Sequence, residues 1–217
     1  MTQYADLDHA AAAHCLAVFG AFHPVPDDDL PGSKTLVMFG PAEPGFWPHI
    51  TASPEWRDGV ADPIDRWSKR VLGEIAVAWG GTAFFPSDGP PYPPFIRWAL
   101  RTGRVWASPV QLLVHDRAGL MVSFRGALAL PERIALPEPP KASPCCTCAD
   151  QPCRSACPVS ALTGTGYDVT ACHAFLDRVE GQSCLSSGCV ARSTCPVSQA
   201  YGRLPEHSSY HMRLFHT

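Results

Sequence analysis

Cysteine is the residue type with the clearest chemical signal in this chain. Nine of its ten cysteines lie between residues 145 and 195. The first run, from Cys145 to Pro158, has the spacing C-x2-C-x4-C-x3-C-P, which is two residues longer in its middle gap than the ligand run of bacterial ferredoxins. The second run is more open and also ends in a Cys-Pro pair, Cys195 and Pro196. A 4Fe–4S cluster requires four converging thiolates, so this pattern predicts iron–sulfur chemistry.

The two Cys-Pro pairs predict how the ligands are shared between two clusters. In two-cluster ferredoxins, the cysteine before the proline binds the cluster of the other motif. Applied here, this rule divides eight cysteines into two sets. The first cysteine set is Cys145, Cys148, Cys153 and Cys195, and the second cysteine set is Cys157, Cys172, Cys184 and Cys189. Cys146 is left over as a free thiol, although spacing alone leaves open whether Cys145 or Cys146 is the ligand.

Zinc and disulfides are the competing interpretations of the same cysteines. Two four-cysteine zinc sites would use the same number of ligands and would make the chain a zinc-stabilised structural protein. Zinc, however, gives no reason for two Cys-Pro endings. Disulfides require an oxidising compartment, and the first residues, MTQYADLDHAAAAHC, lack a charged and then apolar leader. We therefore expect a cytoplasmic protein with two 4Fe–4S clusters, and a single cluster is a further alternative.

Charge and hydropathy narrow the class of partner. The net charge of −3 argues against a broad nucleic-acid surface. No apolar run is long enough to span a bilayer, so a membrane is not expected either. The expected partner is a redox protein that donates electrons, and a small-molecule substrate is a second expectation.

The elements that position the cysteines are predicted from hydrophobic periodicity. Helices are expected at residues 6–19, 62–79 and 95–102, and buried strands at residues 34–39 and 82–85. Asp62 as N-cap, Pro63 at the first helical position and Gly80 after the last turn favour the second of these helices. The segment Gly40–Ile50, which carries Phe46 and Trp47, is expected to be a loop.

The last segment before the cysteines is predicted to be a β-hairpin. Gln111–His115 and Leu120–Leu130 would be its strands, joined by a turn at residues 116–119. Helices mixed with a hairpin favour an α+β class rather than a doubly wound parallel sheet. We predict an α+β domain at residues 1–136 and a ferredoxin-like domain with a docked tail at residues 137–217. The tail carries His207, His211 and His216, and a metal site at the first two is the alternative to docking.

The cysteine-rich region resembles that of epoxyqueuosine reductase, a cobalamin- and iron–sulfur-dependent family of tRNA queuosine synthesis. The specific match is a lone cysteine in a D-x-x-x-C-x-x-[FY]-L context, which here is Asp168, Cys172, Phe175 and Leu176. Earlier in the chain, Asp88-Gly89-Pro90 and the stretch QLLVHDRAGLMVSFRGAL are similar to the family's D-x-G-P and LLxHPxxG regions. The family's turn of several glycines corresponds here to TGRVWASPV, which has Gly103 alone.

The resemblance implies a nitroreductase-like, corrinoid-binding N-terminal domain followed by a two-cluster bacterial ferredoxin-like module. Its cofactor would be a cobalamin, or a flavin such as FMN. Asp88 would be the proton donor, and its alternative role is to form an Asx turn before Gly-Pro. The aromatic candidates for the cofactor site are Phe46, Trp47, Tyr92, Trp98 and Trp106. The family's C-terminal helical repeats, which help to hold tRNA, have no counterpart here, so tRNA is not the expected substrate.

Three functions follow from these observations. The first is an iron–sulfur oxidoreductase that relays electrons through two 4Fe–4S clusters to a corrinoid or flavin site in the N-terminal domain. The second is a non-catalytic, ferredoxin-like electron carrier. The third is the zinc-stabilised structural protein.

Overall fold

The computed structural model describes residues 3–216, and the ends of both predicted domains, residues 1, 2 and 217, lie outside the described part. The chain divides into two compact units. The first unit contains the residues up to Arg104 together with Ser123–Pro139. The second contains Val105–Val122 and the residues from Pro140 onwards. The cysteine-bearing unit is therefore larger than the predicted 137–217 domain, because it includes residues 105–122.

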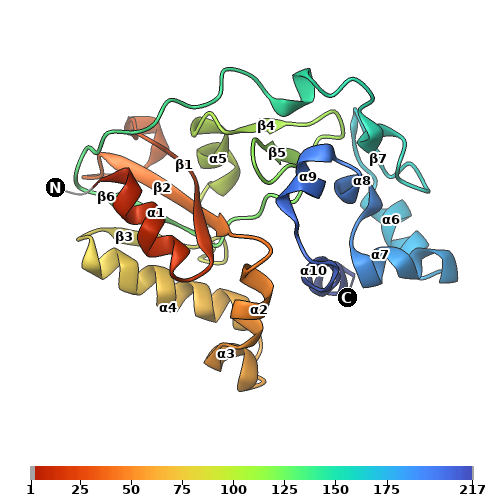
Figure 1. Cartoon of the computed structure of the whole chain (residues 1–217), viewed down its shortest axis with the longest axis horizontal. Coiled ribbons are helices and arrows are strands. Elements are labelled where there is room, and N and C mark those ends of the chain that lie inside the picture. Colours follow the sequence, from red (N-terminus) through yellow and green to blue (C-terminus); the bar gives the residue numbers. More distant parts are fainter. Residues whose placement is uncertain (1–2, 217) are drawn as a thin grey trace. The chain divides into compact units, whose positions relative to one another are not determined.

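The first unit is built on one antiparallel sheet with the strand order β1-β2-β6-β3 (Figure 1). Its strands are β1 (Leu16–Phe22), β2 (Thr35–Pro41), β3 (Thr82–Phe84) and β6 (Gly126–Leu130). The two central strands, β2 and β6, are buried along their whole length. Because both faces of these two strands are buried, their sequences are continuous apolar runs and do not alternate between apolar and polar residues.

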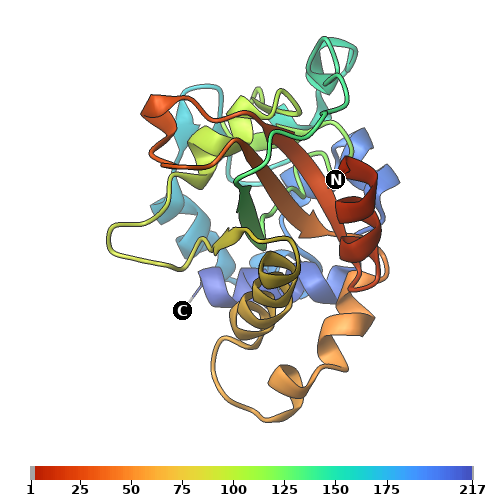
Figure 2. The ribbon, with the colours of Figure 1, turned by 90° about the vertical axis from the view of Figure 1, so that its left-hand side faces the viewer.

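Five α-helices accompany this sheet. They are α1 (Tyr4–Ala12), α2 (Phe46–Thr51), α3 (Pro54–Arg57), α4 (Pro63–Ala78) and α5 (Phe95–Arg101), with a short 3-10 helix at Pro26–Asp28. The longest, α4, packs on β3 and β6 and runs alongside the sheet in both views (Figures 1 and 2). Its buried face includes Trp67 and Leu72. Pro63 starts the helix as predicted, whereas Asp62 adopts a left-handed conformation and its side chain makes no capping hydrogen bond.

Most elements predicted for the first unit are confirmed. The strands at 34–39 and 82–85 and the helices at 62–79 and 95–102 are all present, with small shifts at their ends. The helix predicted at 6–19 is wrong in its second half, which forms β1. Cys15 has a positive φ of 52° and ends the helical path, and the following LAVFGAF segment pairs with β2. The predicted loop Gly40–Ile50 is also partly wrong, because α2 begins at Phe46.

The hairpin predicted between residues 111 and 130 is wrong. Instead, β5 (Leu113–His115) pairs with β4 (Val105–Ala107) in the second unit, and β6 belongs to the sheet of the first unit. The tight turn at 116–119 does form, because His115 Nδ1 accepts N–H groups from Arg117 and Ala118. Beyond it, the carbonyls of residues 120–122 bond to arginine side chains rather than to a partner strand.

The second unit consists of short elements. Its strands β4 and β5 form one two-stranded sheet, and β7 (Leu162–Thr163) and β8 (Gly166–Tyr167) form another. Its helices are α6 (Val169–Leu176), α7 (Gln182–Ser187), α8 (Val190–Ser193), α9 (Pro196–Tyr201) and α10 (Pro205–Phe215), with 3-10 helices at Pro144–Cys146, Pro152–Arg154 and Val179–Gly181. Mixed helices and small antiparallel sheets agree with the predicted α+β class.

The C-terminal helix α10 packs on α7 within the second unit (Figure 1). Ser209 Oγ donates to the carbonyl of Leu185 over 2.7 Å, and His207 is fully buried. His216 contacts Asp177 at the end of the described tail, with 2.9 Å between Nε2 and Oδ1.

None of the helices within residues 3–216 combines the length and the apolar character that a bilayer crossing requires.

Candidate functional site

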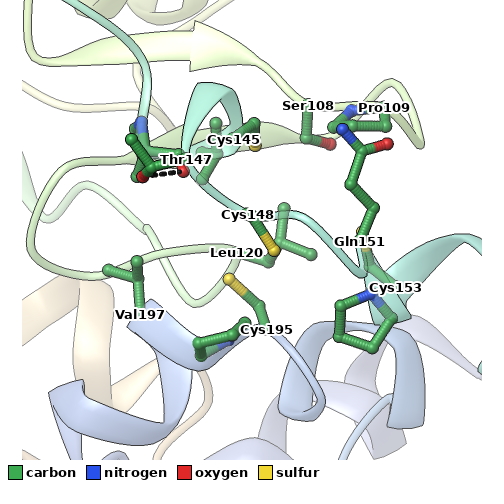
Figure 3. Close-up of a pocket in the computed structure, with 14 residues that line it drawn as sticks. Ser108, Pro109, Leu120, Cys145, Thr147, Cys148, Gln151, Cys153, Cys195 and Val197 are labelled. Carbon is green, nitrogen blue, oxygen red and sulfur yellow. Dashed lines mark hydrogen bonds between the residues drawn. The ribbon is translucent and has the colours of Figure 1, made fainter.

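The first cysteine set lines a cavity of about 200 Å³ in the second unit (Figure 3). All four of its members, Cys145, Cys148, Cys153 and Cys195, contribute to the wall. Figure 3 shows the sulfur atoms of Cys148 and Cys195 pointing toward one another. Much of the remaining wall is apolar, with Val114 and Leu120 from the segment that precedes the cysteines.

Proline and its neighbours explain how the sequence places three of these four thiols. Pro144 starts a 3-10 helix, and Ser143 Oγ caps it by accepting the N–H of Cys145. Pro152 starts a second 3-10 helix that carries Cys153. Pro196 is the first residue of α9, which leaves Cys195 in the extended conformation just before the helix. A fixed proline φ and a missing N–H suit each of these starts, so the chain turns sharply at the cysteines.

The second cysteine set lines a smaller cavity, of about 30 Å³, in the same unit. All four of its members, Cys157, Cys172, Cys184 and Cys189, contribute to this wall, together with apolar side chains such as Phe175. These thiols are carried mainly by helices: Cys172 lies on α6, Cys184 on α7, and Cys189 directly precedes α8.

Two local contacts hold the second set in place. Asp168 caps α6, because its Oδ1 accepts the N–H of Ala171 over 2.9 Å. The backbone N–H of Ala161 donates to the sulfur of Cys157 over 3.3 Å. Tyr167 lines the same cavity as Cys172. An N–H donor aimed at sulfur is a recognised means of tuning a thiolate ligand.

The cysteines before proline lie with the other motif. Cys157, which precedes Pro158, lines the second cavity, and Cys195, which precedes Pro196, lines the first. Each cavity therefore combines three cysteines of one motif with the last cysteine of the other. The structure thus groups the eight cysteines in the same two sets that the ferredoxin rule predicts.

Burial raises the pKa of thiols in both cavities. Desolvation is the main cause for Cys145 and Cys153 in the first cavity, and neighbouring cysteines of the same set add to it. The same causes raise the pKa of Cys172 and Cys184 in the second cavity. Thiolates gathered in such surroundings are unfavourable without a cation, and a bound metal centre removes that cost.

Cys146 is exposed and is not among the residues that line the first cavity. Its neighbour Cys145 is half-buried and lines it. Of the two adjacent residues, Cys145 is therefore the one that lies at the cavity.

The four cysteines that line each cavity match the number and type of ligands of a 4Fe–4S cluster, and most of the other lining residues are apolar. Within residues 3–216, no group of three or more His, Cys, Asp or Glu side chains is arranged to hold a metal ion.

The candidate proton donor Asp88 lies in the first unit. Its side chain is 39% exposed and forms an ion pair with Lys69, with 2.8 Å between Oδ1 and Nζ. Its other oxygen accepts the backbone N–H of Phe85 over 3.2 Å. These contacts tie Asp88 to Lys69 and back to Phe85; the predicted Asx turn before Gly-Pro is not what they form, because residue 90, two positions on, is a proline without an N–H.

The aromatic candidates have separate surroundings. Phe46 and Trp98 are buried in the first unit, where they pack edge-on against Trp67 and Phe84 at centroid distances of 5.6 Å in each case. Trp47 packs against Trp56, and Tyr92 is 65% exposed. Trp106 lies on β4, in the second unit. Core packing therefore accounts for Phe46 and Trp98.

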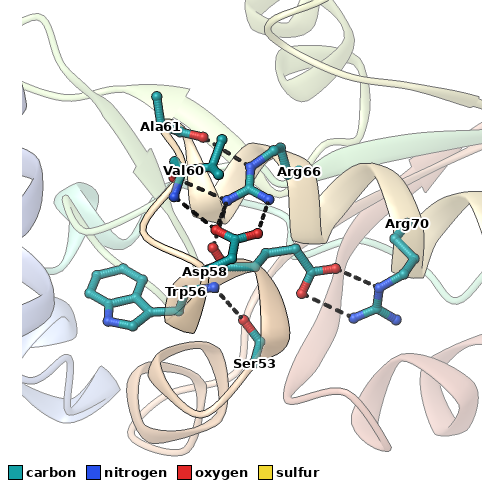
Figure 4. Close-up of polar contacts among 8 residues, drawn as sticks. Ser53, Trp56, Asp58, Val60, Ala61, Arg66 and Arg70 are labelled. Atoms are coloured by element: carbon teal, nitrogen blue, oxygen red, sulfur yellow. Dashed lines mark hydrogen bonds and ion pairs between the residues drawn. The ribbon is translucent and has the colours of Figure 1, made fainter.

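A polar cluster joins α3 to α4 in the first unit (Figure 4). Arg66 forms an ion pair with Asp58 over 2.7 Å, and Arg70 forms one with Glu55 over 2.6 Å. The hydrogen bonds from Arg70 lower the pKa of Glu55. All four residues are paired with one another, so their role is to fix the two helices.

Sequence reasoning missed three residues that lie close to the second cavity. Tyr167 contacts Cys172, whereas Arg192 and Arg203 lie in a neighbouring cavity that Cys189 also lines. The position of Arg192 between two predicted ligands was the available signal.

Comparisons with protein-family models, with curated proteins and with solved structures found no match for this chain.

Proposed function

We propose that this chain is an iron–sulfur electron-transfer protein whose second unit holds two 4Fe–4S clusters. One observation carries the proposal: eight of the ten cysteines fall into two groups of four around two separate cavities. The first cysteine set would bind one cluster, and the second cysteine set would bind the other. The ferredoxin-like sharing of ligands between motifs supports clusters over two unrelated metal sites.

Bound 4Fe–4S clusters supply reversible one-electron oxidation and reduction. The chain's own residues would prepare the sites in two ways. Pro144, Pro152 and Pro196 direct the thiols of the first set into their cavity. Apolar side chains such as Leu120 and Phe175 keep water from the sulfur atoms, which affects the reduction potential.

The finer identity that we propose is a ferredoxin-like module attached to a nitroreductase-like, corrinoid-domain-like unit, related to epoxyqueuosine reductase. In that form the protein would be a reductase with a cobalamin or FMN and would not act on tRNA. The alternative, a non-catalytic electron carrier, is favoured by the contacts of Asp88 with Lys69 and by the core positions of Phe46 and Trp98. Titration of the anaerobic protein with a cobalamin and with FMN separates the two, because the carrier should bind neither.

The decisive test of the metal is anaerobic purification followed by iron, acid-labile sulfide and zinc analysis. We expect about eight irons and eight sulfides per chain, which is what two 4Fe–4S clusters contain. Cys146→Ala is the matched control, because it removes a thiol of the same region that lies outside both sets. Stoichiometric zinc without sulfide would instead identify the zinc-stabilised structural protein.

A further inference from the structure

Two histidines of the second unit meet where the C-terminal tail reaches α6. His173 lies on α6, one position after Cys172, and His216 directly follows α10. Their Nδ1 atoms are 2.9 Å apart, although the residues are 43 positions apart in the sequence. The other ring nitrogen of His216, Nε2, lies 2.9 Å from Oδ1 of Asp177, the residue that follows α6. Two imidazoles and a carboxylate are therefore brought together by the docking of the tail.

The contact with Asp177 decides which nitrogen of His216 can act as a metal ligand. A carboxylate accepts hydrogen bonds, so Nε2 of His216 carries a proton and donates it to Asp177. In the neutral ring, Nδ1 then has a lone pair, and this atom faces Nδ1 of His173. The single proton between the two Nδ1 atoms therefore comes from His173. A metal ion that replaces this proton would be bound by both nitrogens.

The distance between the two Nδ1 atoms matches two neighbouring ligands of one metal ion. With metal–nitrogen bonds of about 2.0–2.1 Å, nitrogens at a right angle lie about 2.9 Å apart, and nitrogens at the tetrahedral angle lie about 3.3 Å apart. The observed 2.9 Å fits the right angle. Square-planar and tetragonal geometries have this angle and are typical of Ni²⁺ and Cu²⁺, whereas zinc is usually tetrahedral.

The surroundings of the two histidines also suit a bound metal ion. Histidines that bind a metal usually donate their other ring N–H to a carboxylate, and Asp177 takes this position beside His216. The ring of Phe215 packs against His173 at a centroid distance of 4.6 Å and restrains it. The side chain of His216 is 18% exposed, so solvent reaches the pair. Because no third protein ligand completes a metal site within residues 3–216, water would supply the remaining ligands.

We propose that His173 and His216 form a binding site for a divalent transition metal ion such as Ni²⁺, with Asp177 orienting His216. The ion replaces the proton between the two nitrogens, and this proton passes to solvent. A bound ion joins the end of α10 to α6. Because α6 carries Cys172, the ion also restrains the helix that presents this thiol of the second cysteine set. The inference uses neither cluster, so it goes beyond the proposed function and does not depend on it.

The test is a calorimetric titration of the anaerobically purified chain, without an affinity tag, with Ni²⁺. Cys146→Ala is the background, because it removes an exposed thiol that would compete for the ion. We expect one saturable site per chain with a Kd below about 100 μM. His216→Gln should weaken binding at least tenfold, and Asp177→Asn should weaken it by about tenfold, as the loss of a carboxylate partner usually does. His211→Gln is the matched control, because this histidine of the same tail contacts His207 instead.

A second measurement locates the bound ion. Hydrogen exchange in the last turn of α10 should become slower when Ni²⁺ is added, and this change should be absent in the His216→Gln variant. Zn²⁺ is the comparison ion and should bind more weakly than Ni²⁺. The inference is overturned if no saturable site is found, or if the site survives His216→Gln and is lost with His211→Gln. Either result leaves the proposed function standing, whereas absence of iron and sulfide would overturn the proposed function alone.

Discussion

The two cysteine cavities have equal numbers of thiols and different surroundings. The first is the larger, and two of its four thiols, those of Cys145 and Cys153, lie on 3-10 helices. Three thiols of the second lie on or next to the helices α6, α7 and α8, and Tyr167 lines the cavity with them. Within residues 3–216, no charged side chain lines either cysteine cavity, but Arg192 lines a neighbouring cavity together with Cys189 of the second set. Because charge and hydrogen bonds to sulfur set cluster potentials, four equal ligands do not imply two equal clusters.

Both cysteine motifs contribute to each of the two cavities. Each cavity is completed by the cysteine that ends the other motif, Cys157 or Cys195. The two sites are therefore coupled through the chain, although their thiols belong to separate sets.

The largest effect should follow from removal of both metal centres. The second unit consists of short helices and two-residue to three-residue strands, so bound metal should contribute much of its stability. After chelation under anaerobic conditions, we expect residues 140–216 to lose protection in hydrogen exchange before the sheet of the first unit does. The sheet strands β2 and β6 serve as internal controls because they are fully buried. A second unit that stays protected after complete iron loss would contradict this prediction.

Single cysteine replacements should remove the two clusters one at a time. Cys195→Ala should remove the cluster held by the first set, and Cys184→Ala the one held by the second. Each should reduce the iron content from about eight to about four per chain, with a different electron paramagnetic resonance signal lost in each case. Loss of the same signal in both variants would show that the two cysteines serve one cluster, which the division into two sets does not allow.

Arg192→Gln tests whether the two cavities differ in their electrostatic surroundings. The positive charge near Cys189 stabilises a reduced cluster, so its loss should lower one midpoint potential. A tenfold change in the equilibrium constant, or about 59 mV, is the expected scale. The other potential should stay unchanged in the same redox titration. Arg154→Gln, which alters an exposed arginine near the first set, is the control. Equal shifts of both potentials would contradict a local effect.

The smallest effect concerns the pH dependence of the metal-free protein. Burial raises the pKa of Cys145, Cys153, Cys172 and Cys184, so the folded chain holds their protons more tightly than the unfolded chain does. The resulting stability is present below the unfolded thiol pKa of about 8.5 and is lost as pH rises through the raised values. We expect the thermal midpoint of metal-free protein to fall by a few degrees between pH 7.5 and pH 10.

The loaded protein should respond to pH in the opposite direction. Metal binding displaces thiol protons, so acid weakens the clusters whereas mild alkali does not. Iron retention should therefore decline below neutral pH, and parallel melting curves of both forms would reveal the contrast. A metal-free protein that is more stable at pH 10 than at pH 7.5 would contradict the assigned pKa directions.

Local patterns by themselves determined several elements of this protein. The apolar run at residues 34–39 forms a buried strand, and Pro63 starts the long helix α4. The two Cys-Pro pairs were enough to divide eight cysteines into the sets that line the two cavities. These predictions rest on neighbours in the sequence, where backbone preference and ligand spacing act directly.

Tertiary structure decided what depends on distant partners. The runs at 113–115 and 126–130 both favour strands, yet each pairs with a different segment and they end in different units. Cys145 and Cys146 have nearly the same sequence context, and only their exposure separates them. In the sequence, Arg192 is simply a polar residue between two cysteines. Only the structure shows that its guanidinium donates hydrogen bonds to the carbonyls of Leu120 and Val122. Strand pairing, burial and charge compensation depend on three-dimensional neighbours, which spacing along the chain does not specify.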